Sequence, residues 1–159
     1  TVSAPLASYT LGAGDQIRVI VFDQDQVTGL YFVDASGKIS VPLVGNVRAA
    51  HRTTQQVERA IAARLRAQDI IKEPRVSAEV VLYRPYFILG EVSAPGKYQF
   101  NAGLTVEKAV ATAGGYTIYA DKYRIRITRQ EGGELVTIPA LPFDVVRPGD
   151  SVFIEERWF

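Results

Sequence analysis

The chain has 159 residues, of which 47% are hydrophobic and 22% charged, a balance typical of a globular protein rather than of a disordered chain. Its formal net charge of +1 lacks the basic excess expected of a nucleic-acid-binding protein. Because it contains no cysteine and one histidine, the sequence excludes disulfides, thiolate zinc sites, cysteine nucleophiles and histidine-rich metal sites.

The start of the chain leads us to expect that a longer precursor was cleaved or shortened. The sequence begins with Thr1 and contains no methionine, so we expect that an N-terminal segment, with any targeting signal, precedes it in the precursor. No apolar run approaches the roughly 18 residues that a membrane-spanning helix needs.

Residues 1–8 are small, polar and proline-bearing, and predict a linker or arm. A first domain is expected over residues 9–84. It begins with a turn at residues 12–15, and alternating apolar residues then predict a strand over residues 16–22.

A hairpin is expected next. Two short apolar runs, residues 31–33 and 38–44, flank a type I turn that closes on Gly37. Pro42 lies inside the second run and predicts that this strand is at a sheet edge, because proline cannot donate a hydrogen bond to a neighbouring strand.

Thr53 and Gln56 have the spacing of a capping box and predict the start of a long helix over residues 54–69, ended by Pro74. Its expected buried stripe consists of Val57, Ala60, Ile61 and Leu65. A strand over residues 75–83 would complete the first domain.

A second domain is expected over residues 85–159. A Pro95-Gly96 turn would join two short strands, and a short helix would end at Gly114 and Gly115. This order is typical of the front half of a β-grasp-like module. The remaining pattern predicts strands near residues 123–129, 134–139 and 151–155. The fold class is therefore predicted to be α+β, with two small sheet-and-helix domains.

One short motif occurs once in each expected domain: Gly14-Asp15 and Gly149-Asp150 each precede alternating apolar residues. Glycine permits the backbone of a tight turn, and aspartate can accept backbone N–H groups there. We interpret both pairs as turns that start strands. The alternative is that Asp15 or Asp150 is a catalytic carboxylate.

No catalytic motif is found. Glu155 and Glu156 are adjacent in an expected strand and so point to opposite faces. His51 is interpreted as a solvated residue at the helix entry, and neither a phosphate-binding loop nor a Gly-x-Ser-x-Gly elbow is present. We therefore expect neither an enzyme nor a cofactor.

Two sets of residues could bind a partner. Arg52, Arg59 and Arg66 recur every seven residues, as a solvated helix face or as a contact with an anionic polymer or a neighbouring subunit. The second half is rich in tyrosine, and Tyr98, Tyr116 and Tyr119 are candidates for a subunit interface or for stacking on sugar rings. Ordinary strand packing is the alternative. The closing Arg-Trp-Phe could fold onto the sheet or form a docking tip.

The ordered set of motifs resembles the outer-membrane polysaccharide export proteins of Wza type. Residues 9–17 (Tyr-Thr-Leu-Gly-Ala-Gly-Asp-Gln-Ile), 33–45 and 73–76 are similar to their polysaccharide-export domain. Gly90-Glu91-Val92, with residues 95–98, 113–115 and 147–150, is similar to one soluble-ligand-binding β-grasp (SLBB) domain.

The resemblance implies transport rather than catalysis. It implies a ring-like homo-oligomer that secretes capsular polysaccharide or exopolysaccharide, located in the periplasm and attached to the outer membrane by a lipid anchor upstream of Thr1. The implied partners are the polysaccharide and an inner-membrane co-polymerase or tyrosine kinase. The alternative function is a monomeric periplasmic module that binds a glycan or another ligand.

The motif positions are expected to be structural rather than catalytic, since each fits a turn or a strand start. They are Gly14, Asp15, Gly37, Pro42, Gly90, Pro95, Gly96, Gly114, Gly115, Gly149 and Asp150.

Overall fold

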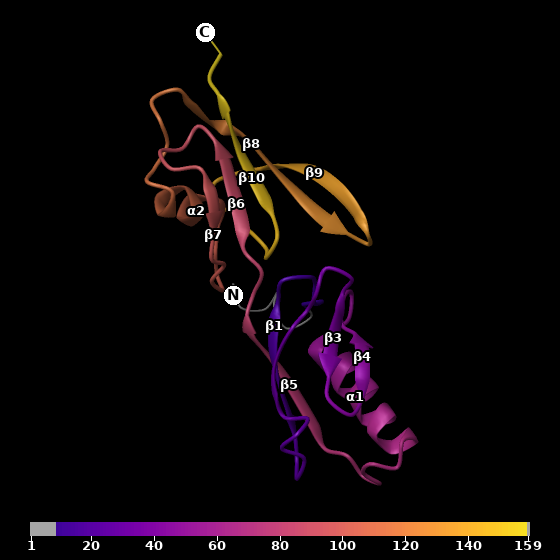
Figure 1. Cartoon of the computed structure of the whole chain (residues 1–159). Coiled ribbons are helices and arrows are strands. Elements are labelled where there is room, and N and C mark those ends of the chain that lie inside the picture. The colour runs from indigo at the N-terminus through magenta and orange to yellow at the C-terminus, as the bar shows by residue number, and fades with distance from the viewer. Residues whose placement is uncertain (1–8, 159) are drawn as a thin grey trace. The chain divides into compact units, whose positions relative to one another are not determined.

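The computed structural model describes residues 9–158, which form two compact units (Figure 1). The chain passes from the first unit to the second between Arg84 and Pro85. Sheets and helices occur in both units, so the predicted α+β class is confirmed. The expected arm at residues 1–8 lies outside the described residues.

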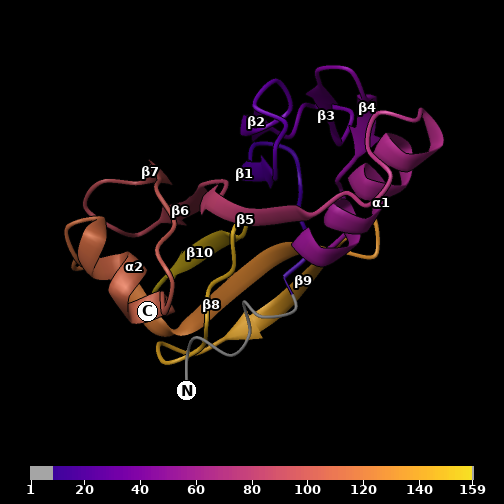
Figure 2. The same ribbon diagram turned by 90° about the horizontal axis from the view of Figure 1, so that it is seen from below.

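The first unit contains a three-stranded antiparallel sheet in the order β2-β1-β5, a separate β3–β4 hairpin and one helix. Figures 1 and 2 both show α1 next to the hairpin. The elements are β1 (Gln16–Val21), β2 (Gly29–Phe32), β3 (Lys38–Val41), β4 (Gly45–Arg48), α1 (Thr54–Ala67) and β5 (Val76–Leu82).

Helix α1 begins as its sequence predicts. Thr53 accepts a hydrogen bond from the N–H of Gln56, whose side chain accepts one from the N–H of Thr53, so the capping box is confirmed. The buried face of α1 packs into the core of the unit, and burial of each large aliphatic side chain contributes roughly 1.5–3 kcal/mol. Its fully buried residues are Val57, Ile61 and Leu65, and Ala60 is partly buried.

The predicted end of α1 was wrong. The helix ends at Ala67, and Asp69 adopts a left-handed conformation with φ of 55°. The turn is closed by the N–H of Ile70, which donates to the carbonyl of Leu65 (3.0 Å). Pro74 therefore lies beyond the end of the helix and does not cause it.

The predicted hairpin in the first unit was also wrong. β2 pairs with β1, and β3 pairs with β4, a strand that the sequence analysis missed. β3 ends at Val41, so Pro42 lies in the β3–β4 turn and not within a strand. Pro42 and the two residues after it prolonged the apolar run, which hid this turn.

The second unit is a five-stranded sheet in the order β7-β6-β10-β8-β9, with one helix, α2 (Figures 1 and 2). β10 runs parallel to β6, and the other neighbours are antiparallel. The elements are β6 (Tyr86–Gly90), β7 (Gly96–Tyr98), α2 (Val106–Thr112), β8 (Ala120–Glu131), β9 (Glu134–Ala140) and β10 (Ser151–Glu156).

The reversal between β6 and β7 is not the tight Pro95-Gly96 turn that was predicted. Gly96 already belongs to β7 and pairs with Ile88. Residues 91–95 make the reversal, and this loop is bonded to the end of α2: the N–H of Ala94 donates to the carbonyl of Ala113 (2.8 Å). The loop conformation therefore depends on a contact that is distant in sequence.

None of the helices among residues 9–158 has the length and apolarity that crossing a bilayer requires.

Gly90 provides a test of the packing between β6 and β10. It has φ of 85°, and a Cβ atom there would lie 2.2 Å from the carbonyl oxygen of Ile154. Gly133 also has φ of 85° but has open space around it. We expect Gly133→Ala to lower the free energy of unfolding by about 1–2 kcal/mol, the cost of a left-handed alanine. Gly90→Ala should cost at least ~2 kcal/mol more, because backbone atoms must move.

Urea unfolding of the two variants measures this difference. Equal losses would mean that β6 and β10 do not approach each other this closely.

Candidate functional site

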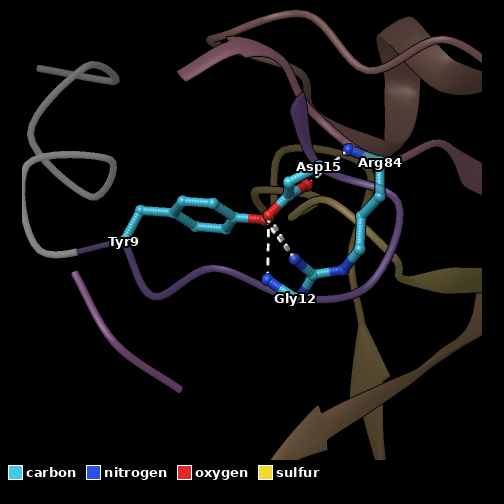
Figure 3. A network of polar contacts seen from close by, with 4 residues as sticks. All are labelled: Tyr9, Gly12, Asp15 and Arg84. Atoms are coloured by element: carbon cyan, nitrogen blue, oxygen red, sulfur yellow. Dashed lines mark hydrogen bonds and ion pairs between the residues drawn. The ribbon is translucent and has the colours of Figure 1, made fainter. Parts of the chain in front are cut away.

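The first Gly-Asp corner surrounds a buried carboxylate (Figure 3). Oδ2 of Asp15 accepts hydrogen bonds from the N–H of Gly12 (2.9 Å) and the hydroxyl of Tyr9 (2.6 Å). The guanidinium of Arg84 lies 3.0 Å from the same oxygen, and the backbone N–H of Arg84 donates to Oδ1 (2.7 Å). Gly14, with φ of 98°, allows the turn that brings these donors together.

These contacts form a closed network. Arg84 also donates to the hydroxyl oxygen of Tyr9 and lies over its ring, with 5.4 Å between Cζ and the ring centroid. A Cβ atom on Gly12 would lie 2.7 Å from the Arg84 guanidinium, so a larger residue there would displace this group from its position beside Asp15. The buried charge of Asp15 is therefore paired and hydrogen-bonded on both oxygens, as a buried carboxylate requires.

The network also affects Tyr9. Burial of its hydroxyl, and next the adjacent Asp15 carboxylate, raise the pKa of Tyr9 well above its usual value, although Arg84 opposes the shift. Tyr9 therefore keeps its proton and remains the donor to Asp15.

The second corner repeats this design. Asp150 is buried and accepts a hydrogen bond from the N–H of Arg147 (2.7 Å), and Gly149 has φ of 84°. Arg129 binds the carboxylate with two donors, at 3.1 Å from Nε and 2.6 Å from a terminal nitrogen. A further weak bond joins this terminal nitrogen to the carbonyl of Val145 (3.4 Å).

This arrangement supports a structural role for both aspartates. Their oxygens are occupied by donors of the fold itself, which leaves no free carboxylate oxygen for a substrate. Residues 9–158 contain no group of three or more His, Cys, Asp or Glu side chains that could bind a metal ion.

The sequence analysis missed the arginines that pair with these aspartates. The sequence could have predicted the burial of Arg129. In β8 it follows Ile125 and Ile127 at a period of two, which places its charge on the buried face of the strand. Arg84 had no such signal, because it lies 69 residues from Asp15 in sequence.

Other predicted structural positions have identifiable geometric reasons. Gly37 has φ of 83°, and a Cβ atom there would lie 2.6 Å from the Cβ of Ala50. Gly114 and Gly115 have φ of 88° and 93° directly after α2.

The three predicted arginines do not form one helical stripe. Arg59 and Arg66 are exposed on α1, whereas Arg52 precedes the helix and donates to the carbonyl of Arg48 (3.1 Å). Arg64, which the stripe omitted, donates to the carbonyl of Asn46 (2.6 Å) and so joins α1 to β4.

The candidate tyrosines Tyr98, Tyr116 and Tyr119 differ in their local contacts. Tyr98 stacks on Tyr86 at a centroid distance of 6.1 Å, and its hydroxyl donates to the carbonyl of Ala94. The ring of Tyr116 lies under Lys122, at 5.2 Å from Nζ, whereas Tyr119 is half exposed. Each tyrosine therefore has its own local surroundings.

Replacing the corner aspartates tests how much each unit depends on its network. Asp150→Asn leaves the buried Arg129 without its counter-charge, and Asp15→Asn does the same to the partly buried Arg84. Each variant should lower the free energy of unfolding of its own unit by about 3 kcal/mol or more. Asp25→Asn, in an exposed loop, serves as the control. Amide hydrogen exchange measures the free energy of unfolding of each unit separately. A loss no larger than that of the control would contradict the structural role.

The shift of Tyr9 predicts an alkaline effect. Its pKa is higher in the folded than in the unfolded chain, so its contribution to stability is complete below the unfolded pKa of about 10 and is lost as the pH rises above it. Tyr9→Phe should therefore make the stability of the first unit fall less steeply above that pH. Tyr31 and Tyr83, with pKa values also raised by burial, keep part of the slope in the variant. Hydrogen exchange at several pH values above about 10 measures the stability of the first unit in the wild type and in Tyr9→Phe. If stability fell equally steeply with pH in both, the prediction would be contradicted.

Comparison with known proteins identifies both units. Residues 3–81 match the family described as polysaccharide biosynthesis/export protein, and residues 85–139 match the SLBB domain. The chain is also 36% identical, over 118 residues, to the exopolysaccharide production protein ExoF of Rhizobium meliloti (strain 1021). That match covers 67% of this chain and 28% of the length of the relative. The chain belongs to the polysaccharide biosynthesis/export protein family and carries an SLBB domain after its export domain.

Proposed function

We propose that the chain is a periplasmic component of an outer-membrane polysaccharide export machine, and that it forms a ring-like oligomer through which capsular polysaccharide or exopolysaccharide is secreted. Its proposed partners are the polysaccharide, further copies of the chain and an inner-membrane co-polymerase or tyrosine kinase. The role is transport rather than catalysis.

The observation that carries this proposal is the order of the two domains in one chain, an export domain followed directly by an SLBB domain. The name of the relative, an exopolysaccharide production protein, supports the same class of polymer.

The sheet of the first unit supports self-association. The inward side chains of β1 are buried, yet its outward face and that of β2 also carry large apolar side chains. Ile20, Leu30 and Phe32 are 46%, 54% and 57% exposed, and the pairing of β1 with β2 places Leu30 beside Arg18.

A second copy of the chain is the proposed cover of this apolar face (Ile20, Leu30 and Phe32). Contiguous exposed apolar side chains rimmed by polar residues often mark protein interfaces. The same face carries the exposed ion pair between Arg18 and Glu79, with an N–O distance of 2.7 Å, beside Leu30. In a ring every subunit would bury such a face, which explains why it is apolar.

Leu30→Asp and Phe32→Asp test the ring. Each places a charge on the apolar face without entering the core, so the chain should fold but its cross-linked oligomers should be lost, because an interface disfavours an unpaired charge. Phe143→Asp, which alters an aromatic residue 70% exposed in the second unit, is the matched control. Chemical cross-linking of the full-length protein in cells measures the oligomer.

Export is tested separately. Deleting the gene should abolish secretion of the polysaccharide, and complementation with the Phe32→Asp variant should not restore it. Normal secretion in the deletion strain would refute the export function. Normal secretion by a strictly monomeric protein would refute the ring alone.

A further inference from the structure

The sheet in the second unit carries a groove lined by apolar, charged and aromatic side chains. Side chains alternate along β8 and β10, so that Ile125 and Ile154 are buried on one face while Arg126 and Phe153, which pair with each other, lie on the opposite face. A groove of about 570 Å³ opens along β8 and β9. Its lining includes Tyr123, Arg124, Arg126, Thr137, Asp144 and Glu155.

A second hollow adjoins the groove. It has a volume of about 500 Å³, and its lining includes Arg124, Asp121, Arg157 and Trp158. Since Arg124 lines both, the two hollows are neighbours on β8, and together they are called the extended site below. Each volume falls within the roughly 300–1,000 Å³ of typical ligand pockets.

Two aromatic rings are available at this site. Tyr123 is 82% exposed and Trp158 is 78% exposed. Trp158 is nevertheless positioned, because Arg124 lies over its ring with 5.0 Å between Cζ and the centroid, and Arg124 also donates to the carbonyl of Glu156 (3.3 Å). Exposed, positioned aromatic faces suit a ligand with an apolar ring face.

The groove also presents fixed donors and acceptors. Arg126 forms an ion pair with Glu155 and lies over the ring of Phe153, with 4.1 Å between Cζ and the centroid. The guanidinium supplies donors and the carboxylate supplies acceptors side by side. A sugar hydroxyl both donates and accepts, so neighbouring hydroxyls match such a pair.

The charges of the extended site cancel. Its lining contains three arginines and three acids, namely Arg124, Arg126, Arg157, Asp121, Asp144 and Glu155. A polyanion would gain little from a site without net charge, because affinity for polyanions comes mainly from excess positive charge. The balance therefore favours a neutral ligand.

We propose that this extended site binds a segment of neutral polysaccharide. Sugar rings stack on Trp158 and Tyr123, and hydroxyl groups bind Arg126 and Glu155. The assignment rests on the proposed export function, which makes a polysaccharide the polymer that the chain meets.

Intrinsic fluorescence tests the site directly, because Trp158 is the only tryptophan in the chain. Titration of the full chain with cellohexaose or laminarihexaose, which are neutral glucose hexamers, should change the emission of Trp158. Tyr123→Ala should weaken binding about tenfold, the equivalent of one lost stacking contact. Phe143→Ala removes an exposed aromatic residue of the same unit that does not line the site and should leave binding unchanged.

The Trp158→Ala variant lacks the fluorophore, so its affinity for the hexamers is measured by titration calorimetry. It should bind about tenfold more weakly than the wild type. Both replaced side chains are mostly exposed, so the variants should fold. Affinity should change less than about twofold between about 50 and 500 mM NaCl, because no net charge is neutralised.

Three results would overturn the proposal: no binding of either neutral hexamer, binding that both alanine variants retain, or binding of hexagalacturonate alone with loss at high salt. None of these results bears on the secretion assay of the deletion strain, so the binding site can fail while the export function stands.

Discussion

A buried aspartate paired with an arginine is the interaction on which each unit depends. Asp15 and Asp150 both end a turn and start a strand, and both carry a charge that is stable in the interior only because an arginine and backbone N–H groups surround it. The two corners also bind the residues where the chain passes between the units: Arg84 bonds to Asp15, and the carbonyl of Pro85 accepts from the N–H of Gly149 (3.0 Å).

Because the buried aspartates serve the fold, binding to a partner is expected to occur on the surfaces of the two units. The outward face of β1 and β2 exposes Ile20, Leu30 and Phe32, whereas the groove along β8 and β9 combines an aromatic ring with paired charges. The first is suited to a protein neighbour, because water is excluded most favourably from apolar side chains. The second is suited to a hydroxyl-rich polymer. A member of an export family needs both kinds of surface if it is to assemble and also meet its polymer.

Features with a local cause were predictable. The start of α1 follows from a capping box that spans four residues, and the end of α2 follows from Gly114 and Gly115. Features with a distant cause were not. The sequence analysis missed β4, misplaced the end of α1 and assigned β2 to the wrong partner, since the apolar run after β3 hid a turn and the choice of partner depends on the whole sheet.

The sequence by itself determined where glycine permits a turn, which strands alternate, where the helices start and that the Gly-Asp corner occurs twice, because each depends on residues within a few positions of one another. Only the tertiary structure decided which arginine neutralises each aspartate, that β10 runs parallel to β6 and that Tyr123 and Trp158 border one extended site. These arrangements join residues far apart in the chain, and they exist only after the sheets have assembled.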